Sequence, residues 1–184
     1  AQREDGFWYD VIVFAIDTGL RHDGELNAIT PDEIDFGKKT MTLKRPKTGK
    51  WSTIPLTNRA LEVVKRRREV ALKNDGNRFF PISKSSLRHN WDKYIKLSGL
   101  SDEYTPYSTR HTFITRLVEA DVSPKAVQHL AGHKSIETTL QYYTHSTNEV
   151  LENAITKLEE YKKAKTKKAE VSSLIGHNSR KVLK

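Results

Sequence analysis

The chain has 184 residues, of which 36% are hydrophobic and 30% charged, a balance typical of one globular domain with a well-solvated surface. It contains no cysteine, which excludes disulfide scaffolds, thiolate zinc sites and cysteine nucleophiles. No apolar run approaches the ~20 residues that span a bilayer, and the start lacks a signal-peptide pattern, so we expect an intracellular protein with no membrane partner.

The positive charge is concentrated near the end of the chain. The net charge is +9, and residues 161–184 contribute +7 of it, with eight basic residues against one acidic residue. Residues 1–160 therefore carry only +2. A basic protein attracts polyanions such as nucleic acids, but most of this signal lies in a tail. We expect residues 164–184 to be loosely ordered or to pack on a neighbouring molecule.

The first part of the chain predicts a buried helix followed by a small antiparallel sheet. The apolar segment 7–17 is long enough for a helix, and Gly19 stands where a helix stop belongs. Apolar residues then alternate with polar ones in three short segments, 34–36, 41–43 and 54–56. The sequence PKTGK, residues 46–50, predicts the tip of a hairpin between the last two.

Helices are predicted from there on, each with a starting and most with a stopping signal. The expected starts are Asn58, Ser85 or Ser86, Thr105-Pro106, Ser123-Pro124 and Ser135, and the expected stops are Gly76, Gly99 and Gly132. A further amphipathic helix is expected at 148–163. The fold class is therefore mainly α with a small antiparallel β-sheet (α+β). The predicted organisation is a domain at 1–147, a C-terminal helix at 148–163 and the tail.

Several residues that could carry chemistry are ambiguous by themselves. Arg21 follows the first helix, and Lys47 lies at the hairpin tip, where solvation is the ordinary explanation. Tyr107 and Arg110 are three residues apart and would share a helix face. Arg110 lies among apolar residues, so it needs an anion, either an internal carboxylate or an external phosphate.

The segment around His129 and His133 allows two readings. Their i, i+4 spacing invites a zinc site, but Gly132 interrupts the helix between them and no third ligand has a plausible spacing. Two capped helices around a glycine turn fit a helix-turn-helix better, which would bind DNA without chemistry.

The order of the motifs along the chain is more informative than any one of them alone. The strings TGLR, PKTGK, YSTRHT, LAGHKS and TTLQYYTH occur in this order between about Asp17 and His145. In this order the chain resembles the tyrosine recombinases, also called the phage-integrase family, and specifically their catalytic domain. The resemblance implies a site-specific recombinase that cuts and rejoins DNA through a 3′-phosphotyrosyl intermediate, without metal, ATP or any other cofactor.

The resemblance also assigns roles to individual residues. Arg21 and Arg110 would hold the phosphate, since guanidinium forks suit the charge of its oxygens. Lys47 would protonate the departing 5′-oxygen, with Lys50 as the alternative if the hairpin register differs. His133 would donate a hydrogen bond to the phosphate. Other basic residues, expected to bind DNA, are Lys44, Arg45, Lys50 and Lys134.

The nucleophile is one of two adjacent tyrosines. Tyr143 is ten residues after His133 and starts the YTH string that often follows the nucleophile in this family, so we expect it to attack. Tyr142, nine residues after His133, is the alternative, because both spacings occur. Two neighbouring residues on a helix point about 100° apart and cannot both face one phosphate.

Two positions depart from the family pattern. Tyr107 stands where a histidine is usual, which leaves a general base at this position in doubt. The usual acidic residue is displaced, because position 24 is glycine, so Glu25 or Asp23 would support the arginines.

The resemblance has consequences for partners and for rival functions. The expected partners are a double-stranded recombination site and other protomers in a tetramer on DNA. The family's separate DNA-clamping domain is not seen before this one, so we expect a C-terminal fragment that binds DNA weakly. A type IB topoisomerase, a telomere resolvase and a non-catalytic helix-turn-helix regulator remain as alternatives.

Overall fold

The fold is organised by its apolar first helix. The structure is a computed structural model that describes residues 2–73, 77–143, 152–163 and 165–166. Helix α1 (Gln2–Thr18) buries Trp8, Val11 and Phe14 against the sheet and the second helix. It ends at Gly19, whose φ of +62° is the left-handed conformation that the sequence predicted for a stop. Two short 3₁₀ turns follow, η1 (Leu26–Ala28) and η2 (Pro31–Glu33).

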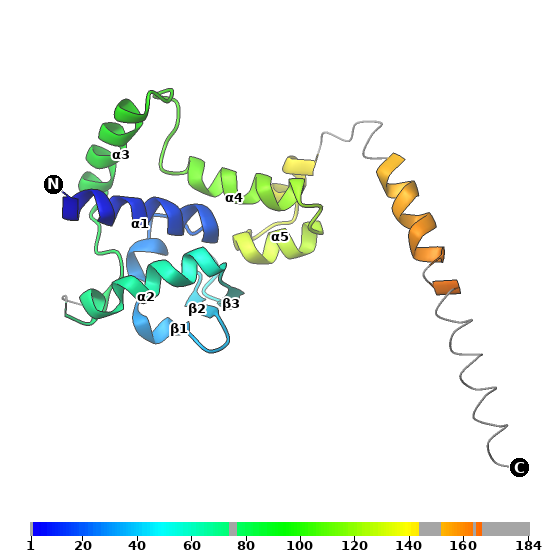
Figure 1. Cartoon of the computed structure of the whole chain (residues 1–184), viewed down its shortest axis with the longest axis horizontal. Coiled ribbons are helices and arrows are strands. Elements are labelled where there is room, and N and C mark those ends of the chain that lie inside the picture. Colours follow the sequence, from blue (N-terminus) through cyan, green and yellow to red (C-terminus); the bar gives the residue numbers. More distant parts are fainter. Residues whose placement is uncertain (1, 74–76, 144–151, 164, 167–184) are drawn as a thin grey trace, which may run out of the picture. The chain divides into compact units, whose positions relative to one another are not determined.

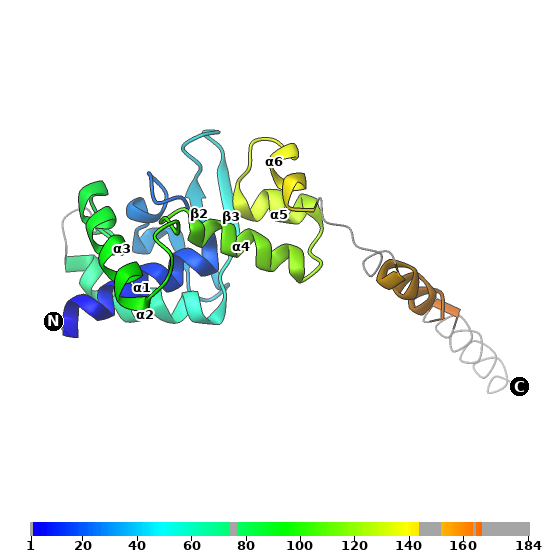
Figure 2. The ribbon, with the colours of Figure 1, turned by 90° about the horizontal axis from the view of Figure 1, so that it is seen from above.

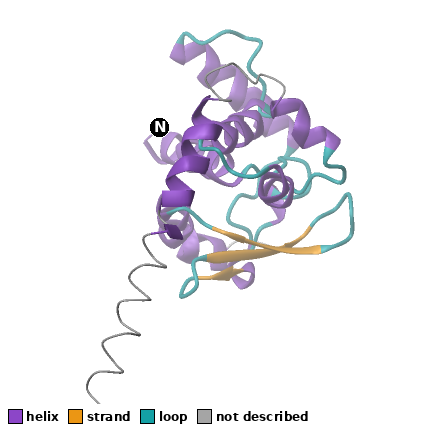
Figure 3. Ribbon diagram, turned by 90° about the vertical axis from the view of Figure 1, so that its right-hand side faces the viewer, coloured by secondary structure: helices purple, strands orange, loops and turns teal. Residues whose placement is uncertain are grey.

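The predicted antiparallel sheet is confirmed. Its strands are β1 (Ile34–Asp35), β2 (Thr40–Lys44) and β3 (Trp51–Pro55), in the order β1-β2-β3. Met41 pairs with Ile54, and both side chains are buried because they face the helices. The sheet lies along one side of the helices formed by residues 2–143 (Figure 3). The connection between β2 and β3 is the predicted hairpin.

Helices α2 (Asn58–Lys73) and α3 (Lys84–Ser98) form near the predicted positions, but their caps differ. The Thr57 hydroxyl, not Asn58, accepts a hydrogen bond from the backbone of α2, at 3.0 Å from the Ala60 nitrogen. Ser83 caps α3, so the prediction of Ser85 or Ser86 was wrong by two or three residues. Gly99 ends α3 with φ +68°, as predicted, whereas Gly76 lies outside the described residues.

The last helices of the domain form a second, smaller cluster. They are α4 (Ser108–Glu119), α5 (Pro124–Ala131) and the one-turn α6 (Glu137–Leu140), followed by the 3₁₀ turn η4 (Gln141–Tyr143). Helix α4 begins at Ser108, later than the predicted start at Thr105-Pro106, while Ser123 caps α5 as predicted. Ile114 and Val127 are buried between α4 and α5. Helix α4 also packs on α1, so it joins this cluster to the main core (Figures 1 and 2).

The chain divides into two units, Ala1–Tyr143 and Thr144–Lys184. Residues 152–163 of the second unit are helical and expose Ile155, Leu158 and Tyr161. The predicted boundary at 147 and most of the basic tail lie outside the described residues, so both stay predictions. Among the described helices, none is both long and apolar enough to cross a membrane.

Candidate active site

Two arginines far apart in the sequence bind neighbouring carbonyl groups at the end of α5. Arg21 Nη2 donates to the carbonyl of Gly132 at 3.0 Å, and Arg110 Nη2 donates to the carbonyl of Ala131 at 2.5 Å. Arg110 Nη1 also donates to the carbonyl of Gly19 at 2.7 Å. The ends of α1 and α5 and the first turns of α4 therefore bring both guanidinium groups into one place.

Glu25 balances part of this positive charge. Its carboxylate is 1% exposed and accepts two hydrogen bonds from Arg21, from the backbone nitrogen and from Nη1, both at 2.8 Å. It also pairs with Arg45 at 3.3 Å. Asp23, the other acidic candidate, has a 74% exposed side chain and pairs with Lys84. Glu25 therefore pairs directly with Arg21 and Arg45, whereas Asp23 pairs with Lys84 at the surface.

Arg110, unlike Arg21 and Arg45, forms no ion pair with a carboxylate in the described part of the chain. It is fully buried, its hydrogen bonds go to two carbonyls, and its Nε has no partner in the described part of the chain. Burial lowers the pKa of Arg110 from its usual value, and repulsion from Arg21 lowers it further. The guanidinium remains cationic, so a phosphate that reached it would be strongly attracted.

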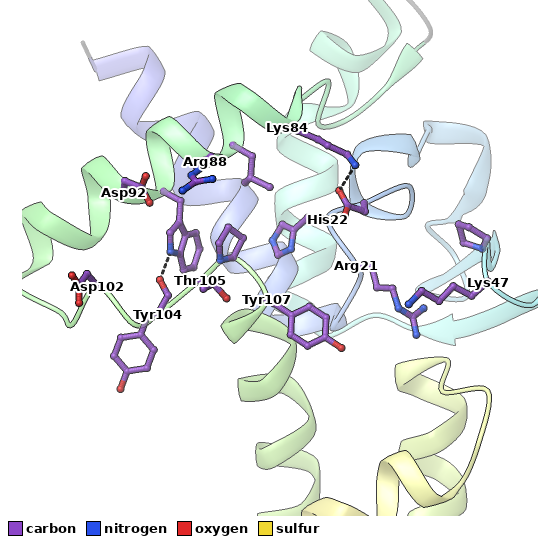
Figure 4. A pocket seen from close by; sticks show the side chains of 15 residues that line it. Arg21, His22, Lys47, Lys84, Arg88, Asp92, Asp102, Tyr104, Thr105 and Tyr107 are labelled. Carbon is purple, nitrogen blue, oxygen red and sulfur yellow. Dashed lines mark hydrogen bonds and ion pairs between the residues drawn. The ribbon is translucent and has the colours of Figure 1, made fainter.

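Lys47 borders the arginine site from the hairpin. Its exposed side chain lines a cavity of about 690 Å³ together with Arg21 and Tyr107. Figure 4 shows these three side chains directed toward the same space. Lys47 also lines a second cavity of about 690 Å³, with His133. The hairpin lysine is thus within reach of the groups that would hold a phosphate.

His133 follows the left-handed Gly132 (φ +65°) and lies close enough to Arg110 and Arg21 for their charges to act on it. Its Nδ1 shares a hydrogen bond of 2.8 Å with the hydroxyl of Thr139. Burial, followed by repulsion from Arg110 and Arg21, lowers the pKa of His133 from 6.5 to about 4. The imidazole is therefore neutral near pH 7 and can still donate one hydrogen bond.

The depressed pKa of His133 gives a titration prediction. Since the folded value of about 4 lies below the unfolded 6.5, protonation favours the unfolded chain. Its stabilising contribution is present above about pH 6.5 and is lost as the pH falls toward about 4. NMR titration should show His133 still neutral at pH ~5.5, with its pKa rising when DNA brings a phosphate beside it. A midpoint near 6.5 without DNA would contradict the burial of this imidazole beside the arginines.

The two tyrosines point to different surroundings. The hydroxyl of Tyr142 lies 2.6 Å from Nδ1 of His111, whereas Tyr143 donates its hydroxyl proton to the carbonyl of Val122. Burial raises the pKa of Tyr142, while the charge of Arg110 acts in the opposite direction. The pKa of Tyr143 is raised by burial and by Asp121, with no contribution from the arginines. The geometry therefore favours Tyr142, the alternative at the sequence level.

Tyr107 and His111 form one aromatic group at the start of α4. Tyr107 immediately precedes the helix and is 46% exposed, and its ring meets His111 edge to face at 4.9 Å. His111 had no predicted role, although it stands in the string YSTRH one helical turn after Tyr107. That i, i+4 spacing was the available signal. Within the described residues, no three His, Asp or Glu side chains are placed to hold a metal ion.

Comparison with known proteins identifies the family of the chain. Residues 7–149 match the model of the phage integrase family. The chain belongs to the phage integrase family. It is 28% identical over 145 residues to the tyrosine recombinase XerC of Syntrophus aciditrophicus, covering 69% of this chain and 46% of the relative. It is also 28% identical over 175 residues to the transposase from transposon Tn916 of Enterococcus faecalis, covering 76% and 42%. The chain thus spans less than half of each of these relatives.

Solved structures of phage integrase family members confirm the predicted fold class. The Tn1549 transposon integrase in complex with transposon right end DNA superimposes with a TM-score of 0.68. The match has 24% identity and covers 85% of this chain and 60% of that one. The XerA recombinase gives a TM-score of 0.65 at 22% identity, covering 84% and 59%.

The basic residues expected to bind DNA fall into two groups in this phage integrase family member. Lys44, Lys50 and Lys134 are exposed, as DNA contacts would have to be. Arg45 is only 2% exposed and pairs with Glu25, so a role for it in binding DNA stays a prediction. Its guanidinium points inward because Glu25 supplies a buried counter-charge.

Proposed function

We propose that this chain is the catalytic domain of a site-specific DNA recombinase. The observation that carries the proposal is the pair Arg21 and Arg110, held on adjacent carbonyls of α5 beside a lysine, a neutral histidine and a tyrosine hydroxyl. Fixed cations gathered at one point can stabilise the charge that develops on a phosphate during strand cleavage. The names of the relatives, recombinases and a transposase, support the same activity.

The proposed cleavage is a transesterification. The tyrosine oxygen attacks phosphorus, and the bond between phosphorus and the 5′-oxygen breaks, leaving a 3′-phosphotyrosyl link. The electron pair goes to the departing oxygen, which takes a proton from Lys47. Arg21 and Arg110 meet the charge of the non-bridging oxygens, and His133 donates a hydrogen bond to one of them. A 5′-hydroxyl from another strand reverses the step, so the bond energy is retained.

The geometry supports Tyr142 as the attacking residue. Its hydroxyl already touches His111 at 2.6 Å, and His111 accepts its proton as the attack begins. This role for His111 supplies the base that Tyr107, a phenol, cannot provide near neutral pH. Tyr143 would first have to leave the carbonyl of Val122.

The proposed substrate is double-stranded DNA that carries a recombination site. The Tn1549 integrase, whose fold this chain shares, was solved in complex with transposon end DNA. We further propose that four protomers assemble on two sites, since exchange between two duplexes needs four cleavages. The helix at 152–163 exposes Ile155 and Leu158 and so offers apolar surface for contact between protomers.

A nicked duplex that traps the covalent intermediate tests the proposal. If the strand beyond the cleavage point is short, it diffuses away and religation fails. We expect a protein–DNA adduct that resists denaturant, and we expect none from the double variant Tyr142→Phe/Tyr143→Phe. DNA binding without any adduct would overturn the proposal and favour the helix-turn-helix regulator. If an adduct forms, relaxation of supercoils without joining of two sites would favour the type IB topoisomerase.

A further inference from the structure

Arg45 lies at the centre of the active-site scaffold. Its guanidinium is buried and spans two elements: Nη1 donates to Glu25 at 3.3 Å, and Nη2 donates to the carbonyl of Leu130 at 2.8 Å. Glu25 is also the carboxylate that holds Arg21. One side chain thus ties the end of β2 to the loop after α1 and to the last turn of α5.

The backbone of Arg45 closes the turn that carries Lys47. Its nitrogen donates to the carbonyl of Lys50 at 2.8 Å, and its carbonyl accepts hydrogen bonds from Gly49 at 2.8 Å and from Thr48 at 3.2 Å. Lys47 is two residues away within this closed loop. The position of the lysine therefore depends on where Arg45 is anchored.

Arg45 also packs against the turn that leads to His133. A Cβ added to Gly132 would lie 2.7 Å from Nε and 2.8 Å from Cζ of Arg45, closer than such atoms approach in proteins. Glycine at this position thus leaves room for the guanidinium as well as providing the positive φ of the turn. The buried arginine and the glycine turn fit each other closely.

We propose that Arg45 is a positioning residue that holds Lys47 at the departing 5′-oxygen. The inference rests on the proposed function, in which Lys47 is the acid. The planar guanidinium fork reaches Glu25 and Leu130 at once, and a lysine in its place would keep the charge but could not span both. Without the double anchor the hairpin shifts, and a displacement of about 1 Å in a proton donor is enough to slow catalysis strongly.

Two substrates separate this role from a merely structural one. In the first nicked duplex the scissile bond carries the ordinary 5′-oxygen, and in the second that bridging oxygen is replaced by sulfur. A thiolate departs without protonation because a thiol has a pKa of ~8.5, far below that of an alcohol. We expect Lys47→Ala to slow cleavage of the oxygen substrate by ~10²-fold and to leave the sulfur substrate nearly unaffected.

The variant Arg45→Lys should follow the same pattern: cleavage of the oxygen substrate should slow by at least ~10-fold, and cleavage of the sulfur substrate should change little. Arg45→Gln is measured alongside, so that one folded variant remains if the other is unstable. Thermal unfolding shows whether each variant is folded. The matched control is Lys44→Ala, because Lys44 is the exposed neighbour of Arg45 on β2. This variant should reduce cleavage of both substrates equally, because it lowers the affinity for DNA.

The outcomes distinguish the two proposals. If Arg45→Lys or Arg45→Gln loses activity equally on both substrates, or loses none, the positioning role is wrong while the recombinase function stands. If the unmodified protein forms an adduct with neither substrate, the proposed function itself fails.

Discussion

Replacing Tyr142 by phenylalanine is expected to reduce the trapped DNA adduct by roughly 10³-fold or more, because the attacking oxygen is lost. The hydroxyl of Tyr142 contacts His111 and lies within the influence of Arg110. Ring packing is preserved in the variant, so DNA binding should change little. The adduct is measured on the nicked duplex by its resistance to denaturant, and binding is measured separately by titration.

The matched variant is Tyr143→Phe. It removes a hydrogen bond to the carbonyl of Val122 and should cost only about 1 kcal/mol of stability, with adduct formation within a few-fold of the unmodified protein. The opposite result, loss in Tyr143→Phe and retention in Tyr142→Phe, would show that Tyr143, the residue indicated by the YTH string, is the nucleophile. It would also mean that the turn η4 rotates when DNA binds.

The second large effect is expected at Glu25. Its buried carboxylate is paired with Arg21 and Arg45, so Glu25→Gln leaves two cations close to Arg110 without their counter-charge. Removing one partner of a buried ion pair typically costs ~3–5 kcal/mol in the free energy of unfolding. Denaturant unfolding measures this loss, and adduct formation should fall with it because Arg21 is no longer held.

Asp23→Asn is the control for Glu25→Gln. Asp23 pairs with Lys84, and both side chains are largely exposed, so little change in stability is expected. Equal effects of the two variants would contradict the assignment of Glu25 as the acid that organises the arginines.

Much of the fold was predictable because local signals and periodicity agree. The apolar run ending at Gly19, the hairpin strands and the Ser123-Pro124 start all appear as expected. The helix starts at Thr57 and Ser83 were missed, since several residues that can cap a helix stand close together in the sequence. Tertiary packing determines which of these residues caps the helix, and the local sequence does not indicate which one it is.

Only those residues of the candidate site that belong to short sequence motifs were predictable from the sequence. Arg21, Lys47 and Arg110 stand in recognisable strings, and the structure brings them together. The burial of Arg45 was not predictable, because a lysine-rich hairpin usually indicates a solvated tip. Its partners are 20 and 85 residues away in the sequence.

Whether Arg21 and Arg110 neutralise the charge of one phosphate is tested most directly with a neutral substrate. A methylphosphonate at the scissile position lacks the negative charge, so the clamp has less to stabilise there. We predict that Arg21→Ala and Arg110→Ala each reduce the rate of phosphodiester cleavage by ~10²-fold or more. The same variants should reduce the rate of methylphosphonate cleavage far less. Equal losses on both substrates in these two variants would contradict the account.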